Sequence, residues 1–148
     1  MYTFEQVMKE SKKYFGDDEL AASVFATKYA LCSGKSFIEK SPDDMHKRIA
    51  KEFARIETKY PNPMSEEEIY GLLKDFKYVV PQGSPMSGIG NNKQIQSLSN
   101  CFVVESPNDS YGGILKTDQE QVQIMKRRGG VGFDISSITH KQSPGTSG

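Results

Sequence analysis

The sequence has few cysteines, no excess of either charge and no long apolar run. Its two cysteines, Cys32 and Cys101, lack CxxC spacing and are too few for a disulfide scaffold. Nineteen basic and nineteen acidic residues cancel, so direct binding to nucleic acid is not expected. Because no apolar run is long enough to cross a bilayer and the N-terminus has no signal-peptide core, we expect a cytoplasmic protein with no membrane partner. Its cysteines should be reduced thiols in that compartment.

The features that are present divide the chain of 148 residues in two. Residues 1–77 have the periodic apolar pattern of helices, whereas residues 78–148 are richer in glycine, serine and proline and carry short apolar runs. The apolar share of 36% is low, as expected if part of the core comes from another chain. We therefore predict an α/β protein with an N-terminal helical domain, residues 1–77, and the incomplete start of a second domain, residues 78–148.

Capping residues predict where four helices begin in the first half. Thr3 and Ser65 are each followed three residues later by Gln or Glu, which is capping-box spacing. Ser41-Pro42 is followed by two aspartates, an order that suits a cap, a proline at the first helical position and acids beside the helix dipole. The remaining helix is expected to begin after Asp17 or Asp18 and to end before Gly34.

Apolar residues at helical spacing predict which faces of these helices are buried. The predicted buried residues are, in the second helix, Leu20, Val24, Phe25, Tyr29 and Cys32; in the third, Met45, Ile49, Phe53 and Ile56; and in the fourth, Ile69, Leu72, Leu73 and Phe76. His46 is expected on the solvated side of the third helix.

After residue 77 the pattern favours a loop and then a βαβ unit. Gln82–Asn92 is dense in turn formers and is expected to be a loop. The apolar run Leu98–Val104 predicts a strand buried on both faces, as in a parallel sheet. A helix should follow and end at Arg128, where two glycines stop it, and Val131–Ile138 predicts the second strand.

Four segments contain residue types suited to nucleotide chemistry, and each also has a purely structural interpretation. Gly129-Gly130, after two arginines, would let the backbone approach a phosphate, or would simply end a helix. Ser84 lies in a segment whose hydroxyl and N–H groups suit a phosphate, or form a surface turn. Cys101 is either a reactive thiol or a small core residue. Asp109-Ser110 either accepts a ribose hydroxyl or forms a turn that caps a helix.

Taken together, these segments resemble a known family. VVPQGSPMSG, SLSNCFVVES, DSYGGI and IMKRRGGVGFDISSI are similar, in order and spacing, to the start of the ten-stranded α/β barrel of ribonucleotide reductase catalytic subunits. ELAASVFATKYAL and PDDMHKRIAKEFARIE resemble the helical region before that barrel. The similarity is greatest to the adenosylcobalamin-dependent class II form. It implies an oxidoreductase that makes deoxyribonucleotides for DNA synthesis by thiyl-radical chemistry.

The resemblance implies roles for the matching positions. Cys101 matches one member of the cysteine pair that reduces the substrate and closes to a disulfide. Ser84 matches a contact to the substrate phosphate, and Asn100 a residue that lines the sugar pocket. Gly129 and Gly130 match glycines that approach the substrate.

A second set of positions matches the site for a dNTP or ATP effector. Asp109 matches an acid of this site, and Ser110 beside it is also expected to bind the effector. Thr139 stands where many relatives have an arginine that holds the effector phosphate, and Lys141 is the expected substitute. The helix after Asp109 is expected at the interface of a homodimer.

The resemblance also implies further components. These are a ribonucleotide substrate (a diphosphate is favoured), a thioredoxin-type reductant, adenosylcobalamin bound outside these residues, and a second chain that carries the rest of the catalytic subunit. We expect one product of a split gene rather than a truncation, because the chain stops in a polar Gly/Ser stretch, and we expect it to be inactive alone. The alternatives are a stand-alone nucleotide-binding or regulatory module and a helical interaction domain.

Overall fold

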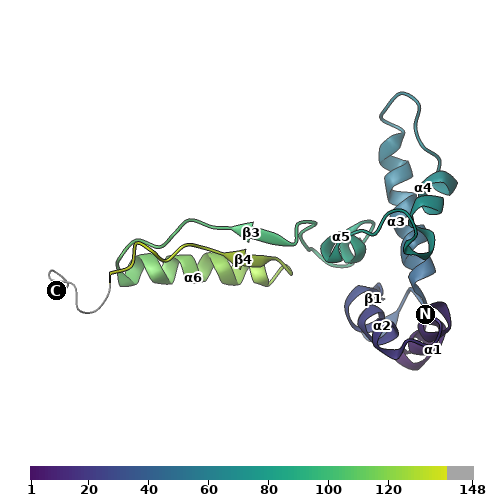
Figure 1. Cartoon of the computed structure of the whole chain (residues 1–148), viewed down its shortest axis with the longest axis horizontal. Coiled ribbons are helices and arrows are strands. Elements are labelled where there is room, and N and C mark those ends of the chain that lie inside the picture. Colours follow the sequence, from purple (N-terminus) through teal and green to yellow (C-terminus); the bar gives the residue numbers. More distant parts are fainter. Residues whose placement is uncertain (140–148) are drawn as a thin grey trace. The chain divides into compact units, whose positions relative to one another are not determined.

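The computed structural model describes residues 1–139, and their contacts separate into two compact units that divide between Leu98 and Ser99. The helical unit, residues 1–98, contains helices α1 to α5 and a small hairpin. The βαβ unit begins at Ser99 and contains β3, α6 and β4 (Figure 1). The sequence placed a boundary between residues 77 and 78, whereas the segment 78–98 packs within the helical unit.

The helical unit begins with two helices that start where capping residues predict. Helix α1 (Phe4–Tyr14) is capped by Thr3 in a complete capping box with Gln6. Helix α2 (Glu19–Val24) is capped by the Asp18 carboxylate, which accepts a hydrogen bond from the Ala21 N–H. These bonds satisfy backbone N–H groups that have no partner inside the helix.

The prediction that the second helix continues to Gly34 is wrong. Helix α2 passes into a π-helical turn, η1 (Phe25–Tyr29), and Ala30 is already extended. The chain then forms a hairpin of β1 (Cys32–Ser33) and β2 (Ser36–Phe37), with Gly34 at a positive φ in its turn. Cys32 therefore lies on a strand and not on a helix face.

Helices α3 (Pro42–Glu57) and α4 (Glu66–Leu73) pack against each other, and α4 continues into the short 3₁₀ turn η2 (Lys74–Phe76). As predicted, Pro42 occupies the first turn of α3 and Ser65 caps α4 in a capping box. The core cluster of the unit joins α1, η1, α3 and α4. Its buried residues are Val7, Phe25, Ala26, Met45, Ile49, Ala50, Ile69 and Leu73.

Several predicted faces are only partly correct. Met45 and Ile49 are fully buried, but Phe53 is 42% exposed. Leu20, predicted to be buried, is 75% exposed. His46, expected on the solvated face, is fully buried, because its ring packs edge-on against Phe76 with centroids 4.5 Å apart.

The prediction of a loop over Gln82–Asn92 is wrong in its first half. Helix α5 (Gly83–Gly88) forms there, although its sequence, GSPMSG, has low helix propensity. Met86 and Ile89 pack against the core cluster. Tertiary contacts therefore select a helix that local propensity disfavours.

The βαβ unit has the predicted order. Strands β3 (Cys101–Val103) and β4 (Gly130–Gly132) are parallel, and α6 (Tyr111–Met125) connects them. Both strands are shorter than predicted. The expectation that the first is buried on both faces is wrong, since Cys101 is exposed and Val103 is 91% exposed while Phe102 between them is half-buried. Alternate side chains of a strand point to opposite faces, and only the face that carries Phe102 is covered within the described residues.

Candidate functional site

The thiol of Cys101 lies on the exposed face of β3, directly beside a glycine. Cys101 is paired in register with Gly130 of β4. A Cβ atom placed on Gly130 would stand 3.5 Å from the Cys101 Sγ and 3.3 Å from the Asn100 carbonyl oxygen. A side chain at position 130 would therefore cover the sulfur, and glycine leaves this flank of the thiol open.

Asn100 and Gly130 are joined by their backbones. The Gly130 N–H donates to the Asn100 carbonyl oxygen over 2.7 Å. This bond aligns β4 with the residue before Cys101, so the thiol is held by a strand and not by a loop. The structure thus brings together three residues predicted for different roles at the substrate: Asn100 for the sugar pocket, Cys101 for the redox pair and Gly130 for close approach of the backbone.

Close packing explains why residue 129 is a glycine. A Cβ atom there would stand 2.5 Å from Ile124 Cγ2 and 2.8 Å from the Phe102 ring. The preceding residue, Arg128, has a positive φ, and the Gly129 N–H donates to the Ile124 carbonyl oxygen at the end of α6. Glycine at 129 lets the chain leave α6 and turn tightly into β4, which is the structural interpretation of this pair of glycines.

Asp109 and Ser110 lie at the start of α6. Ser110 caps this helix by accepting a hydrogen bond from the Gly113 N–H over 3.0 Å. Asp109 accepts a hydrogen bond from the Thr139 hydroxyl. Hydrogen bonds from the Thr139 side chain and then its backbone lower the pKa of the Asp109 carboxyl. Asp109 is thus ionised near neutral pH and contacts Thr139 through this hydrogen bond. Lys141 lies outside the described residues.

Ser84 belongs to the other unit. It lies in the first turn of α5 and is 7% exposed, as Ser87 is 6% exposed in the same helix. The Ser87 hydroxyl donates to carbonyl oxygens of Gly83 and Ser84. Ser84 is therefore part of a short, ordered helix, where the sequence had indicated a surface loop.

Sequence reasoning missed the contacts that hold α5. The Arg48 guanidinium donates to the Met86 carbonyl oxygen over 2.8 Å and to the Ile89 carbonyl oxygen. It also pairs with Glu39 over 2.6 Å, and both side chains are nearly buried, at 10% and 5% exposure. A signal existed, because position 48 is three residues after Met45 and so falls beside the apolar stripe of the helix.

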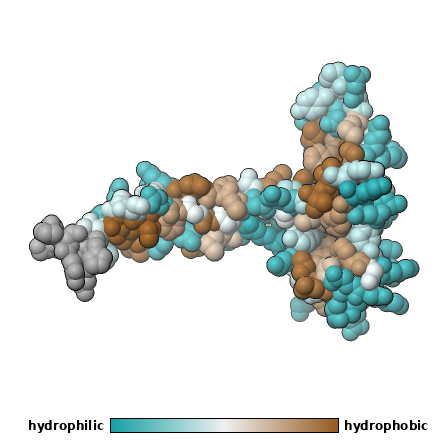
Figure 2. All heavy atoms as spheres, viewed as in Figure 1, coloured by the Kyte–Doolittle hydropathy of each residue, from teal (hydrophilic) through white to brown (hydrophobic). Residues whose placement is uncertain are grey.

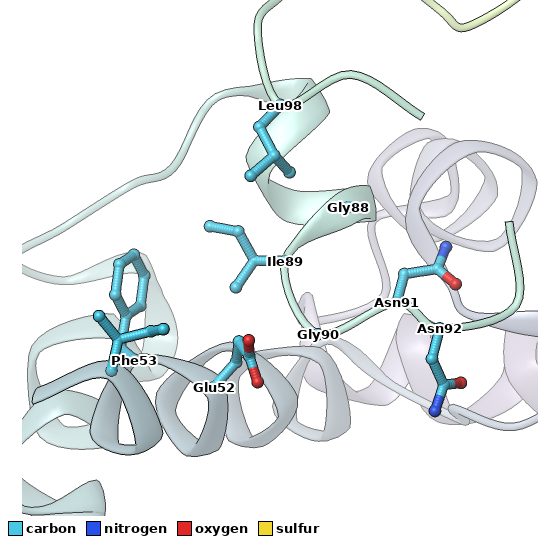
Figure 3. Close-up of a pocket in the computed structure, with 9 residues that line it drawn as sticks. Glu52, Phe53, Gly88, Ile89, Gly90, Asn91, Asn92 and Leu98 are labelled. Carbon is cyan, nitrogen blue, oxygen red and sulfur yellow. The ribbon is translucent and has the colours of Figure 1, made fainter. Parts of the chain in front are cut away.

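A cavity of about 520 Å³ lies in the helical unit next to α5. Figure 3 shows Phe53 of α3, Ile89 and Leu98 around it. Its one carboxylate, Glu52, accepts hydrogen bonds from Arg55 at 2.6 and 3.0 Å. The cavity is lined by apolar side chains, by Asn91 and Asn92, and by this one paired carboxylate.

Residues 1–139 contain no group of three or more His, Cys, Asp or Glu side chains arranged to hold a metal ion. The same residues contain no helix with the length and hydropathy needed to cross a bilayer.

Comparison with known proteins bears on the helical unit. A comparison with curated proteins finds no match. The family described as "Ribonucleotide reductase, all-alpha domain" matches residues 15–92, which include α2, α3, α4 and α5. This match covers more than half of the chain, and it agrees with the helical region that the sequence resembles. The chain therefore belongs to the ribonucleotide reductase family and carries the all-alpha domain found in the N-terminal portion of its large subunit.

Proposed function

We propose that this chain supplies the N-terminal helical domain and the first βαβ unit of the ten-stranded α/β barrel of a ribonucleotide reductase catalytic subunit. The rest of the catalytic subunit completes the barrel, and the subunit forms a homodimer through α6. Family membership supports the assignment of the helical unit to the N-terminal helical domain. The parallel pairing of β3 and β4 across α6 supports the assignment of the βαβ unit to the start of the barrel, because a parallel βαβ unit is the building block of such a barrel.

The observation that carries the proposal is the exposed thiol of Cys101 beside Gly130. In this reaction the 2′-hydroxyl of a ribonucleoside diphosphate is replaced by hydrogen and leaves as water. Two thiols supply the two electrons and two protons and are oxidised to one disulfide. Cys101 is one of these thiols, its partner belongs to the rest of the catalytic subunit, and a thioredoxin-type reductant reopens the disulfide. A rigid strand is suited to hold a reacting sulfur against a sugar.

The neighbouring residues take the binding roles. Asn100 lines the sugar pocket beside the thiol, and Gly130 on β4 and Gly129 before it approach the substrate. Ser84 contacts the substrate phosphate. A dNTP or ATP effector binds near Asp109 and Ser110, with Lys141 in the role of the arginine that Thr139 replaces. Adenosylcobalamin, held by residues outside the described part, would supply the radical that starts the reaction.

The test is reconstitution. This chain is mixed with the remainder of the catalytic subunit, adenosylcobalamin and a dithiol reductant, and formation of dCDP from CDP is measured. Cys101→Ser should lower the rate by roughly 10³-fold or more, as for removal of an essential reacting group. Cys32→Ser is the matched control and should retain activity, because no role in the redox pair is proposed for Cys32, which lies in the β1–β2 hairpin. Activity that survives Cys101→Ser would overturn the proposal.

A further inference from the structure

We infer that Arg48 is a positioning residue for the substrate phosphate, because its guanidinium anchors the C-terminal end of α5, the helix that carries Ser84. This inference rests on the phosphate contact proposed for Ser84. It concerns a different residue, on α3, which is not part of the proposed phosphate contact itself.

The anchor is a single side chain that reaches two carbonyl oxygens. Arg48 Nη2 donates to the Met86 carbonyl oxygen over 2.8 Å, and Nη1 donates to that of Ile89. Both carbonyls lie in the last turn of α5 or directly after it, where a helix leaves carbonyl groups without partners. A cation at this end is also favoured by the helix dipole. Because α5 has only six residues, fixing its end fixes Ser84 as well.

The guanidinium is itself held in place from the opposite side. Glu39 Oε1 accepts from Arg48 Nε over 2.6 Å, and Glu39 Oε2 accepts from the Leu31 N–H over 2.8 Å. Glu39 is thus tied to the backbone that follows η1, and Arg48 is tied to Glu39. The planar guanidinium makes these bonds in several fixed directions at once, which an ammonium group cannot do.

The chain after α5 is shaped to fit the same side chain. Gly90 has φ +72°, and a Cβ atom there would stand 2.9 Å from Arg48 Cγ and 3.3 Å from the Arg48 carbonyl oxygen. Position 90 therefore admits no side chain while Arg48 keeps its place. The hydrogen bonds to α5 and the close approach of Gly90 both depend on the position of Arg48.

The first experiment measures local opening in the whole chain. Amide exchange is followed at Met86 and Ile89, whose N–H groups donate to Gln82 and Pro85 carbonyl oxygens. Arg48→Lys should speed exchange at both amides about tenfold, because hydrogen bonds from a charged donor are lost there. Arg55→Lys is the matched control: it removes an arginine from the same helix whose partner, Glu52, is outside α5.

Gly90→Ala provides a second variant in case Arg48→Lys fails to fold. It should speed exchange at Met86 and Ile89 in the same direction. Its control is Gly71→Ala in α4, where a Cβ atom meets nothing within 4 Å. Unchanged exchange in both test variants overturns the anchoring role.

The second experiment separates positioning from general stability in the reconstituted reductase. Arg48→Lys should raise the KM for CDP about tenfold and leave kcat within about twofold, because a misplaced phosphate contact weakens binding in ground and transition states alike. An unchanged KM, with faster exchange at α5, overturns the positioning role and leaves the proposed function intact. Ser84→Ala tests the proposed phosphate contact itself. If its KM is unchanged, the proposed phosphate contact is wrong, whatever Arg48→Lys does.

Discussion

The helical unit and the βαβ unit of this chain differ in what they bury. All the buried hydrophobic residues of the described chain, among them Met45 and Ile49, lie in the helical unit. The βαβ unit leaves large apolar residues more than half exposed, and Figure 2 shows apolar surface on it. These residues are Val103, Tyr111, Leu115, Val122, Met125 and Ile135.

The difference shows which part of the fold is complete in itself. A domain is stable when apolar faces cover one another, and the helical unit meets this condition with four packed segments. A two-stranded parallel sheet with one helix has two open edges and an uncovered face, so it gains stability by adding further strands. The same open face presents Cys101 to its surroundings. In this protein, incomplete burial and an available thiol have one structural cause.

The sharpest test of the comparison is an isoleucine truncated in each unit. Ile49→Ala removes a fully buried side chain and should lower the free energy of unfolding by about 2–5 kcal/mol. Ile135→Ala, at a position that is 61% exposed, should change it by less than about 0.5 kcal/mol. Chemical denaturation followed by circular dichroism measures both. Equal losses would mean that the βαβ unit has a core of its own.

Two glycine-to-alanine substitutions, at positions 129 and 112, test how tightly the βαβ unit is packed where α6 meets β4. Gly129→Ala should destabilise the unit by about 1–3 kcal/mol, as overpacking does, because its methyl group would collide with Ile124 and Phe102. Gly112→Ala in α6 meets nothing within 4 Å and should be neutral or slightly stabilising. Thermal unfolding of the two variants distinguishes them. A tolerated Gly129→Ala would show that the turn into β4 is loose.

The helical unit should respond to pH through His46. Burial lowers the pKa of this imidazole, an effect that Asp43 and Asp75 partly oppose. Within residues 1–139, neither ring nitrogen has a hydrogen-bond partner. The unfolded chain binds the proton more readily, so stability is greatest above pH about 6.5 and falls as the pH decreases toward the lower folded-state pKa, by up to about 1.4 kcal/mol per pH unit.

His46→Leu is the variant for this experiment. Denaturation midpoints between pH 7.5 and pH 5 should vary less with pH in the variant than in the parent chain. If both chains show the same slope, the buried imidazole is not the group responsible, and carboxylates elsewhere account for the loss.

The smallest expected effect lies at the start of α6. Thr139→Val removes the hydroxyl that donates to Asp109 and should return the pKa of Asp109 toward its usual value near 3.9. Asp134, whose pKa is lowered by Ser136, is the internal control and should not move. Carboxyl chemical shifts followed by NMR through a pH titration report both groups. An unchanged Asp109 would mean that Thr139 does not contact it in solution.

Features that depend on neighbours in the chain were predicted correctly. The capping boxes at Thr3 and Ser65 and the proline at the start of α3 are present. So is the order of strand, helix and strand, with Cys101 on the first strand. These predictions succeed because a cap or a helix stop is decided within three or four residues.

Other features were decided only by tertiary contacts. Helix α5 forms on a weak helical sequence because Arg48 holds its end and the core receives Met86 and Ile89. His46 is buried because Phe76, thirty residues later, covers it. The openness of Cys101 depends on which faces of a two-stranded sheet are covered. The sequence by itself determined where helices α1 to α4 begin and which strand carries the thiol, because those choices are local. The tertiary structure decided what is buried and what is anchored, because both require partners distant in the chain.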